Sequence, residues 1–153
     1  MLTVQRTRFW SNTYVIRDGR RDITEVNVRW TREAGSFVLD GTTFEVGRAG
    51  WASGDFFLSR DGERLASADK PSAFRRRFMI DVDGESFELA AGSIWARTYE
   101  LRRGTRRIGS IRRTSWWINR ADVDLPETLS MEVRVFVTWL VLVMWKRSDD
   151  SSS

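Results

Sequence analysis

Arginine is the residue type with the clearest capacity for chemistry in this sequence. The central candidates are Arg102, Arg103, Arg106, Arg107, Arg112 and Arg113. The first four flank Gly104, where a tight turn would make them project together. A guanidinium group holds phosphate or carboxylate oxygens through two parallel hydrogen bonds. The spacing therefore predicts an anion- and phospholipid-binding hairpin, which Arg97 and the run 75–77 would extend. The alternative is a solvated hairpin whose arginines pair with nearby acids.

The sequence contains no cysteine and no histidine. This removes disulfides, thiol nucleophiles, Ser-His-Asp triads, zinc sites of the common ligand type and a haem-binding histidine. The bases that remain are Asp, Glu, Tyr and Lys, and no spacing among them singles out a catalytic pair. Paired carboxylates of the glycosidase kind are the enzymatic alternative. We expect a binding protein without enzymatic activity and without a cofactor.

Two shorter motifs resemble binding sites. The segment Asp81-Val82-Asp83-Gly84-Glu85, with Glu88 after it, is similar to a calcium loop. A calcium loop of the EF-hand type needs a third oxygen ligand before the glycine and a later bidentate glutamate, and neither is in register. We therefore interpret the segment as a turn and expect no metal. Trp116-Trp117-Ile118 resembles a membrane or base-stacking wedge, but neighbouring strand residues face opposite ways, so we expect one tryptophan in the core.

The charge of the chain is basic and unevenly distributed. There are 25 Lys and Arg against 21 Asp and Glu, a formal net charge of +4. Lysine occurs only at positions 70 and 146, and the excess of arginine is also what a GC-rich genome encodes. Residues 73–120 carry the net excess of positive charge, with 11 arginines against 5 acidic residues, which favours an anionic partner surface. A net charge of +4 is low for a nucleic-acid-binding protein, so we expect nucleic acid less than lipid.

The elements that must position these residues are mostly short strands. Alternating runs are joined by turns at Asp18-Gly19, Asp40-Gly41, Asp61-Gly62, Asp83-Gly84 and Arg103-Gly104. Asp-Gly between alternating runs is typical of a type I′ hairpin, because both central residues need a positive φ. Ten to twelve strands fit in residues 1–120, and such a meander favours a sheet that closes. Gly109 shifts the alternation between Ile108 and Ile111, which indicates a β-bulge.

The C-terminal segment has a different pattern. Asp124, Pro126 and Glu127 predict a helix start, with Asp124 as N-cap and the proline in the first turn. The apolar run that follows ends at Lys146 and Arg147, cations that suit the last turn of a helix. Ser130, Arg134 and Thr138 recur every four residues, which favours a helix over a strand.

A helix that is apolar on nearly every side must be enclosed by protein or by lipid. A membrane anchor needs about 20 apolar residues, whereas the uninterrupted run here is Val135–Trp145. A closed sheet of ten or more strands leaves an interior that something must fill. We therefore expect the helix to fill the barrel. A tail-anchored membrane protein is the alternative.

A meander of Asp-Gly hairpins followed by a proline-opened apolar helix resembles the tubby C-terminal-like superfamily. This superfamily includes the phospholipid scramblases and the LURP-one-related proteins, and small bacterial members end in a segment similar to Leu125-Pro126, Trp139-Leu140 and Trp145-Lys146. The resemblance implies a 12-stranded barrel around a hydrophobic C-terminal helix, and it suggests contact with phospholipid. The cysteine cluster and proline-rich N-terminal region of the scramblases are missing.

Together these patterns predict a mostly β protein, a closed antiparallel β-barrel of about 12 strands that encloses a hydrophobic C-terminal α-helix. We expect one domain over residues 1–147 with the helix at 125–147, and a disordered tail at 148–153. The expected function is non-enzymatic binding to anionic phospholipid or membrane surfaces. The alternatives are a protein-interaction module without a small ligand, nucleic-acid binding through the arginine hairpin, and a tail anchor. No signal peptide is evident at Met1–Trp10, so we expect a cytoplasmic location with peripheral membrane association.

Overall fold

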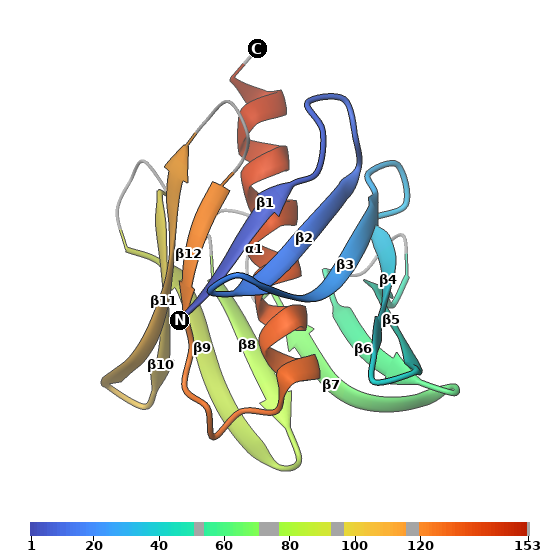
Figure 1. The fold of residues 1–153 in the computed structure, drawn as a ribbon. Coiled ribbons are helices and arrows are strands. Elements are labelled where there is room, and N and C mark those ends of the chain that lie inside the picture. Colours follow the sequence, from blue (N-terminus) through green and yellow to red (C-terminus); the bar gives the residue numbers. More distant parts are fainter. Residues whose placement is uncertain (51–53, 71–76, 93–96, 116–119, 153) are drawn as a thin grey trace.

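The computed structural model describes residues 1–50, 54–70, 77–92, 97–115 and 120–152. Within these ranges the chain forms twelve strands and one helix (Figure 1). The strands are β1 (Leu2–Arg6), β2 (Thr13–Asp18), β3 (Arg21–Arg29), β4 (Ala34–Leu39), β5 (Thr42–Arg48), β6 (Phe56–Arg60), β7 (Glu63–Asp69), β8 (Arg77–Val82), β9 (Glu85–Ala91), β10 (Thr98–Arg103), β11 (Arg106–Ser115) and β12 (Arg120–Asp124), and the helix is α1 (Met131–Ser151).

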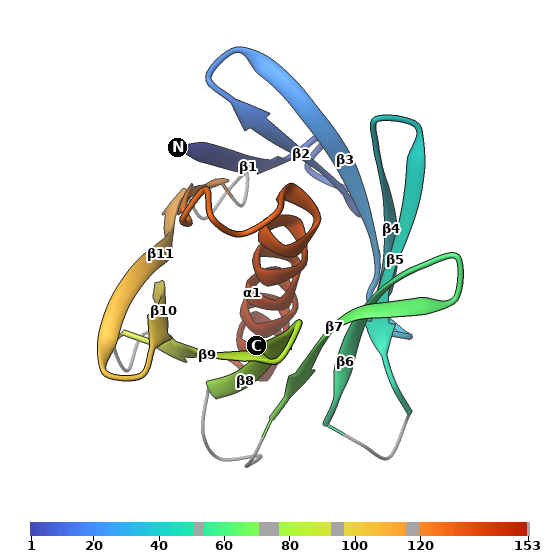
Figure 2. The same cartoon turned by 90° about the horizontal axis from the view of Figure 1, so that it is seen from below.

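The described strands form one closed barrel. Each strand lies antiparallel to its neighbours in sequence, and β1 completes the ring by pairing with β12. The closing ladder places Leu2 opposite Val123 and Val4 opposite Ala121. Seen along the axis, α1 runs inside the ring of strands (Figure 2). The predicted closed antiparallel barrel around a C-terminal helix is confirmed.

Three of the predicted hairpin turns have the backbone that type I′ requires. Asp40 and Gly41 both have positive φ, +47° and +78°, and the pairs at Asp61-Gly62 and Asp83-Gly84 are alike. The predicted hairpin at Asp18-Gly19 also forms, but its turn is not of type I′. Asp18 is still a strand residue opposite Arg21, and only Gly19 has a positive φ, as in a type II′ turn.

Strand alternation gives the barrel two different ends. All the two-residue hairpin turns among the described residues, from Gly19 to Gly104, lie at one end, which we call the turn end. The longer connections, such as residues 7–12 and 30–33, lie at the other end, the loop end. The helix enters at the turn end and finishes among the loops (Figure 1). Successive connections along the chain therefore lie at alternate ends of the barrel.

The predicted bulge near Gly109 is confirmed. In the β10–β11 ladder Leu101 faces Gly109 while Arg102 faces Arg107, so Ile108 is the extra residue. A Cβ at Gly109 would lie 2.6 Å from the backbone oxygen of Asp124. The glycine therefore permits a close approach of β12 as well as the change of parity.

The helix begins later and ends later than its predicted bounds of 125–147. Asp124 is the last residue of β12, where it faces Ser110, and so it is not the N-cap. Ser130 takes that position, without a side-chain capping hydrogen bond. Residues 125–130 are needed to carry the chain from the barrel wall to its axis, and buried Leu125 and Leu129 close the turn end.

At its other end the helix continues to Ser151, so residues 148–151 of the predicted tail are helical. Lys146 and Arg147 consequently do not lie in the last turn as predicted. Asp149 is instead anchored to the barrel wall: Arg113 donates hydrogen bonds of 3.2 and 2.9 Å to its two carboxylate oxygens. Extension of the helix thus brings its final turns into contact with the strands.

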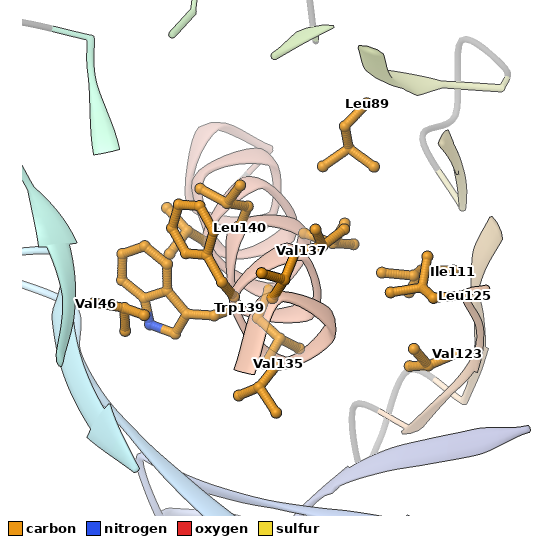
Figure 3. Packing of buried hydrophobic residues seen from close by; sticks show 14 of the residues in the cluster. Val46, Leu89, Ile111, Val123, Leu125, Val135, Val137, Trp139 and Leu140 are labelled. Atoms are coloured by element: carbon orange, nitrogen blue, oxygen red, sulfur yellow. The ribbon is translucent and has the colours of Figure 1, made fainter. Parts of the chain in front are cut away.

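The interior of the barrel is filled by the helix. Every residue from Val135 to Trp145 is buried, and burial of each large apolar side chain stabilises the fold by roughly 1.5–3 kcal/mol. Figure 3 shows Trp139 directed at the wall near Val46, with Ile111 and Leu125 on the opposite wall. The single buried polar residue of this stretch, Thr138, donates a 2.8 Å hydrogen bond to the carbonyl of Arg134.

The Trp139 indole fits inside the barrel because the strand opposite it carries a glycine and no side chain at that point. Gly35 on β4 faces inward, and a Cβ there would lie 3.3 Å from the Trp139 Nε1 atom and 2.1 Å from the Asn27 carbonyl oxygen. The indole also packs edge-on against Phe56, with ring centroids 5.7 Å apart. The glycine and the tryptophan therefore form one packing unit.

The tail-anchor alternative requires a helix that can cross a bilayer. In the part of the chain that the structure describes, no helix combines the length and the hydropathy that a bilayer crossing requires.

Candidate binding surface at the loop end of the barrel

The predicted arginine hairpin exists, and it lies at the turn end, where Gly104 separates β10 from β11. Arg102 donates a 2.7 Å hydrogen bond to Glu100, which raises the pKa of Arg102 and keeps it charged. Arg103 forms a 2.7 Å ion pair with Glu85 and lies over the Phe87 ring. These arginines are thus already neutralised within the protein.

The other predicted arginines do not join them in one patch. Arg107 lies 3.8 Å from Glu100 and Arg112 lies 3.5 Å from Asp122, both on the outer face. Arg113 points inward near the opposite end of the barrel, where it pairs with Asp149. Arg106 is exposed and makes no ion pair within the described ranges. Anion binding by this hairpin stays a prediction, since an anion would have to displace carboxylates that are already in place.

The other binding residues predicted from the sequence do not form a site among the described residues. Arg97 is exposed at the loop end, Arg77 pairs with Glu88 at 3.6 Å, and the rest of the run 75–77 lies outside the described residues. In the calcium-like segment, Ser86 donates a 2.5 Å hydrogen bond to Asp81, and Asp83 forms the turn. The Trp116-Trp117-Ile118 motif lies outside the described residues.

The two ends of the barrel carry opposite charge. Each end consists of the described residues of its connections and the strand residue on each side of them, and the loop end also includes the helix from Lys146 onward. At the loop end the basic residues are Arg6, Arg8, Arg29, Arg32, Arg48, Lys70, Arg77, Arg97, Arg120, Lys146 and Arg147, against Glu33, Asp55, Asp69, Asp149 and Asp150. At the turn end they are Arg20, Arg21, Arg60, Arg103 and Arg106, against Asp18, Asp40, Asp61, Glu63, Asp83, Glu85, Asp124 and Glu127. An anionic surface is therefore attracted to the loop end and repelled by the turn end.

The loop between β1 and β2 adds exposed aromatic residues to the basic end. Phe9 and Trp10 are 69% and 79% exposed, and Arg8 beside them is exposed as well. Backbone hydrogen bonds hold this loop in shape: Thr7 N–H donates to Thr13 at 2.9 Å and Ser11 N–H donates to Arg8 at 3.0 Å. The two rings thus project from a fixed loop and leave large apolar areas in water, which is uncommon in the absence of a binding partner.

The β3–β4 loop lies beside the β1–β2 loop and joins the same surface. The Trp30 indole donates a 2.9 Å hydrogen bond to the side chain of Asn12, and its ring stacks edge-on against Tyr14 at 6.3 Å. On the helix, the Lys146 ammonium lies 5.9 Å from the centre of the Trp30 ring. The loops are therefore positioned relative to each other and to the helix end.

Glu33 connects this loop to the helix more firmly. Arg147 donates two hydrogen bonds of 2.6 Å to the Glu33 carboxylate, and Arg48 donates a third of 3.3 Å. The residue is mostly buried, with a positive φ of +47°. Arg48 and Arg147 are thus paired with Glu33 inside the protein, so their charges contribute little to binding a partner.

Four arginines of the loop end keep their charge available. Arg8, Arg29, Arg32 and Arg120 are exposed, and none of them makes an ion pair within the described residues. Arg120 begins β12, which pairs with β1, so it lies on the same side of the barrel as the β1–β2 loop. We call these four arginines, together with Phe9 and Trp10, the loop-end surface.

The sequence-based predictions do not include this surface. Adjacent Phe9 and Trp10 break the alternation that Leu2 and Val4 begin, and this break was the available signal. Grouping the arginines also required knowledge of which connections share an end of the barrel.

Comparisons with known proteins add nothing to this assignment. No family model matches the chain, and neither the curated proteins nor the solved structures contain a significant match. The resemblance to the tubby C-terminal-like superfamily therefore stays a prediction.

Proposed function

We propose that this chain is a non-enzymatic binding protein that associates with anionic phospholipid surfaces through the loop-end surface. The observation that carries the proposal is the juxtaposition of exposed Phe9 and Trp10 with arginines that have no internal ion pair. Aromatic rings and basic side chains together are typical of proteins that lie on the interface of an anionic bilayer.

The magnitudes are adequate for peripheral binding. Each arginine near an anionic bilayer contributes about 1 kcal/mol, and four are available in the loop-end surface. Burial of the exposed parts of Phe9 and Trp10 adds on the order of 3 kcal/mol for each ring. The acidic turn end favours a single orientation, in which the helix end and the loops face the lipid.

Vesicle sedimentation tests the proposal. The protein should bind vesicles that contain phosphatidylglycerol at low salt, bind phosphatidylcholine vesicles weakly, and lose most of its binding at high salt because exposed charges are screened. The double variant Phe9→Ser/Trp10→Ser and the double variant Arg8→Gln/Arg120→Gln should each bind less than the unmodified chain.

Two matched controls separate the surface from general effects of substitution. Val38→Ser removes an apolar side chain that is 50% exposed on β4, and Arg20→Gln removes an exposed arginine at the turn end. Both should bind like the unmodified chain. The absence of binding at low salt would overturn the proposal and favour a protein-interaction module.

A further inference from the structure

The outer wall of the barrel has a hollow of about 390 Å³ across β3, β4 and β5, close to the loop end. This volume lies within the range of small-ligand sites. The hollow adjoins the loop-end surface, because Arg29 and Arg32 line it. A ligand at an interface bound by the loop end is therefore within reach of it.

The hollow results from the register of four strands. One outward-facing row runs from Arg29 through Ala34 and Gly47 to Phe57. The two middle residues have almost no side chain, so the wall is recessed between an arginine and an aromatic ring. A Cβ at Gly47 would lie 3.3 Å from the Phe57 ring and 3.7 Å from the Ala34 Cβ, so the absence of a side chain there keeps the recess open.

The next row provides polar groups and one acid. Asn27 on β3 is hydrogen-bonded to Ser36 on β4, both through its amide nitrogen and through its amide oxygen, at 3.3 Å. Glu45 on β5 follows Ser36 in the same row. Its carboxylate is exposed and forms no ion pair within the described ranges.

The hollow therefore carries separated and unneutralised charges. Arg29 and Arg32 stand on its β3 side without internal ion pairs, whereas Arg48, which also lines it, is paired with Glu33. Glu45 stands about two strand spacings away, roughly 10 Å across the sheet. A simple anion would be attracted by the arginines but repelled by Glu45. A simple cation would be attracted by Glu45 but repelled by the arginines.

We propose that this hollow binds a phosphodiester that carries a primary ammonium group, of the phosphoethanolamine type. Arg29 and Arg32 hold the phosphate oxygens, and Glu45 accepts hydrogen bonds from the ammonium group. The side-chain oxygens of Asn27 and Ser36 line the space between the two charges. The inference rests on the proposed function in one respect, since it names the headgroup that the membrane-bound protein selects.

Soluble compounds test the hollow without a membrane. The probes are glycerophosphoethanolamine, glycerol phosphate and ethanolamine, and the measurement is the change of amide chemical shifts in a titration of the full chain. We expect glycerophosphoethanolamine to bind about tenfold more tightly than either other probe, because a hydrogen bond to a charged group is worth roughly that factor.

Substitutions assign the contacts. Arg29→Gln should weaken glycerophosphoethanolamine about tenfold, and Glu45→Gln should remove the preference over glycerol phosphate. Ala34→Leu fills the recess without a change of charge and should abolish binding of every probe. Arg20→Gln and Glu63→Gln change exposed residues at the turn end and should leave all affinities unchanged, and circular dichroism verifies that each variant is folded.

The outcomes distinguish this inference from the proposed function. Equal affinity for glycerophosphoethanolamine and glycerol phosphate, or an unchanged preference in Glu45→Gln, overturns the inference even if vesicles bind. Selective binding of the soluble probe by a chain that binds no vesicle keeps the hollow and makes its ligand a free phosphodiester. Vesicle binding that increases when phosphatidylethanolamine is added, and does so only with Glu45 present, supports the lipid as source.

Discussion

Removal of the Asp149 charge should destabilise the protein much more than removal of the neighbouring Asp150 charge. Asp149 is the acidic partner of Arg113, whose side chain is 5% exposed and lies 5.3 Å from the centre of the Trp145 ring. In Asp149→Asn the guanidinium would stay in the wall of the barrel without its carboxylate. The loss of this close charge pair is the cause of the expected destabilisation.

The magnitude follows from the burial of the two partners. Removal of one member of a fully buried ion pair costs about 3–5 kcal/mol, and an exposed pair contributes about 0–1 kcal/mol. Because Asp149 is 34% exposed while Arg113 is buried, we expect about 2 kcal/mol for Asp149→Asn. In a chain of this size that corresponds to a decrease in Tm of about 4–8 °C.

Urea unfolding followed by tryptophan fluorescence, together with thermal melting, provides the assay. Asp150→Asn is the matched control, because Asp150 pairs with Lys146 on an exposed face and lies, like Asp149, in the last turn of the helix. It should cost less than about 1 kcal/mol. Arg113→Met should also cost less than Asp149→Asn, because it removes the buried charge itself. If Asp149→Asn and Asp150→Asn shift Tm equally, the anchoring of the helix end by this pair is refuted.

Three further perturbations follow from the same structure. Trp139→Ala should cost about 3–5 kcal/mol in urea unfolding, because the indole is fully buried inside the barrel. A loss under about 1 kcal/mol would mean that the helix does not fill the interior. Gly35→Ala should cost about 3 kcal/mol in the free energy of unfolding, because the added Cβ would lie 2.1 Å from a carbonyl oxygen. Gly41→Ala is the control: it causes only backbone strain and should cost about 1 kcal/mol. Equal losses in the two variants would contradict the close packing at Gly35. Partial burial and the Asp55 carboxylate raise the pKa of Asp69 above 3.8. The Asp69 carboxyl group therefore binds its proton more tightly in the folded state than in the unfolded chain. The free energy of unfolding consequently decreases as the pH rises through the folded-state pKa of Asp69. Asp69→Asn should therefore raise Tm at neutral pH, and the gain should disappear as the pH falls below 3.8; a gain that persists at acidic pH would contradict this cause.

The candidate site was only partly accessible from sequence. Arg102 and Arg103 were correctly placed beside a hairpin turn, but their partners Glu100 and Glu85 come from strand register, which a single sequence does not specify. Alternation along β11 also sends Arg112 outward and Arg113 inward, so the two neighbours never share a surface. Proximity in sequence therefore overestimated how many arginines act together.

The sequence by itself determined the barrel and its filling. Alternating runs and Asp-Gly turns depend on the backbone of adjacent residues, and an apolar helix such as Val135–Trp145 has to be enclosed wherever it lies. The tertiary structure alone decided where the helix begins, which connections share an end of the barrel, and which charges stay unpaired. Those features depend on contacts between residues far apart in the chain, such as Glu33 with Arg147, whose geometry exists only once the ring of strands has closed around the helix.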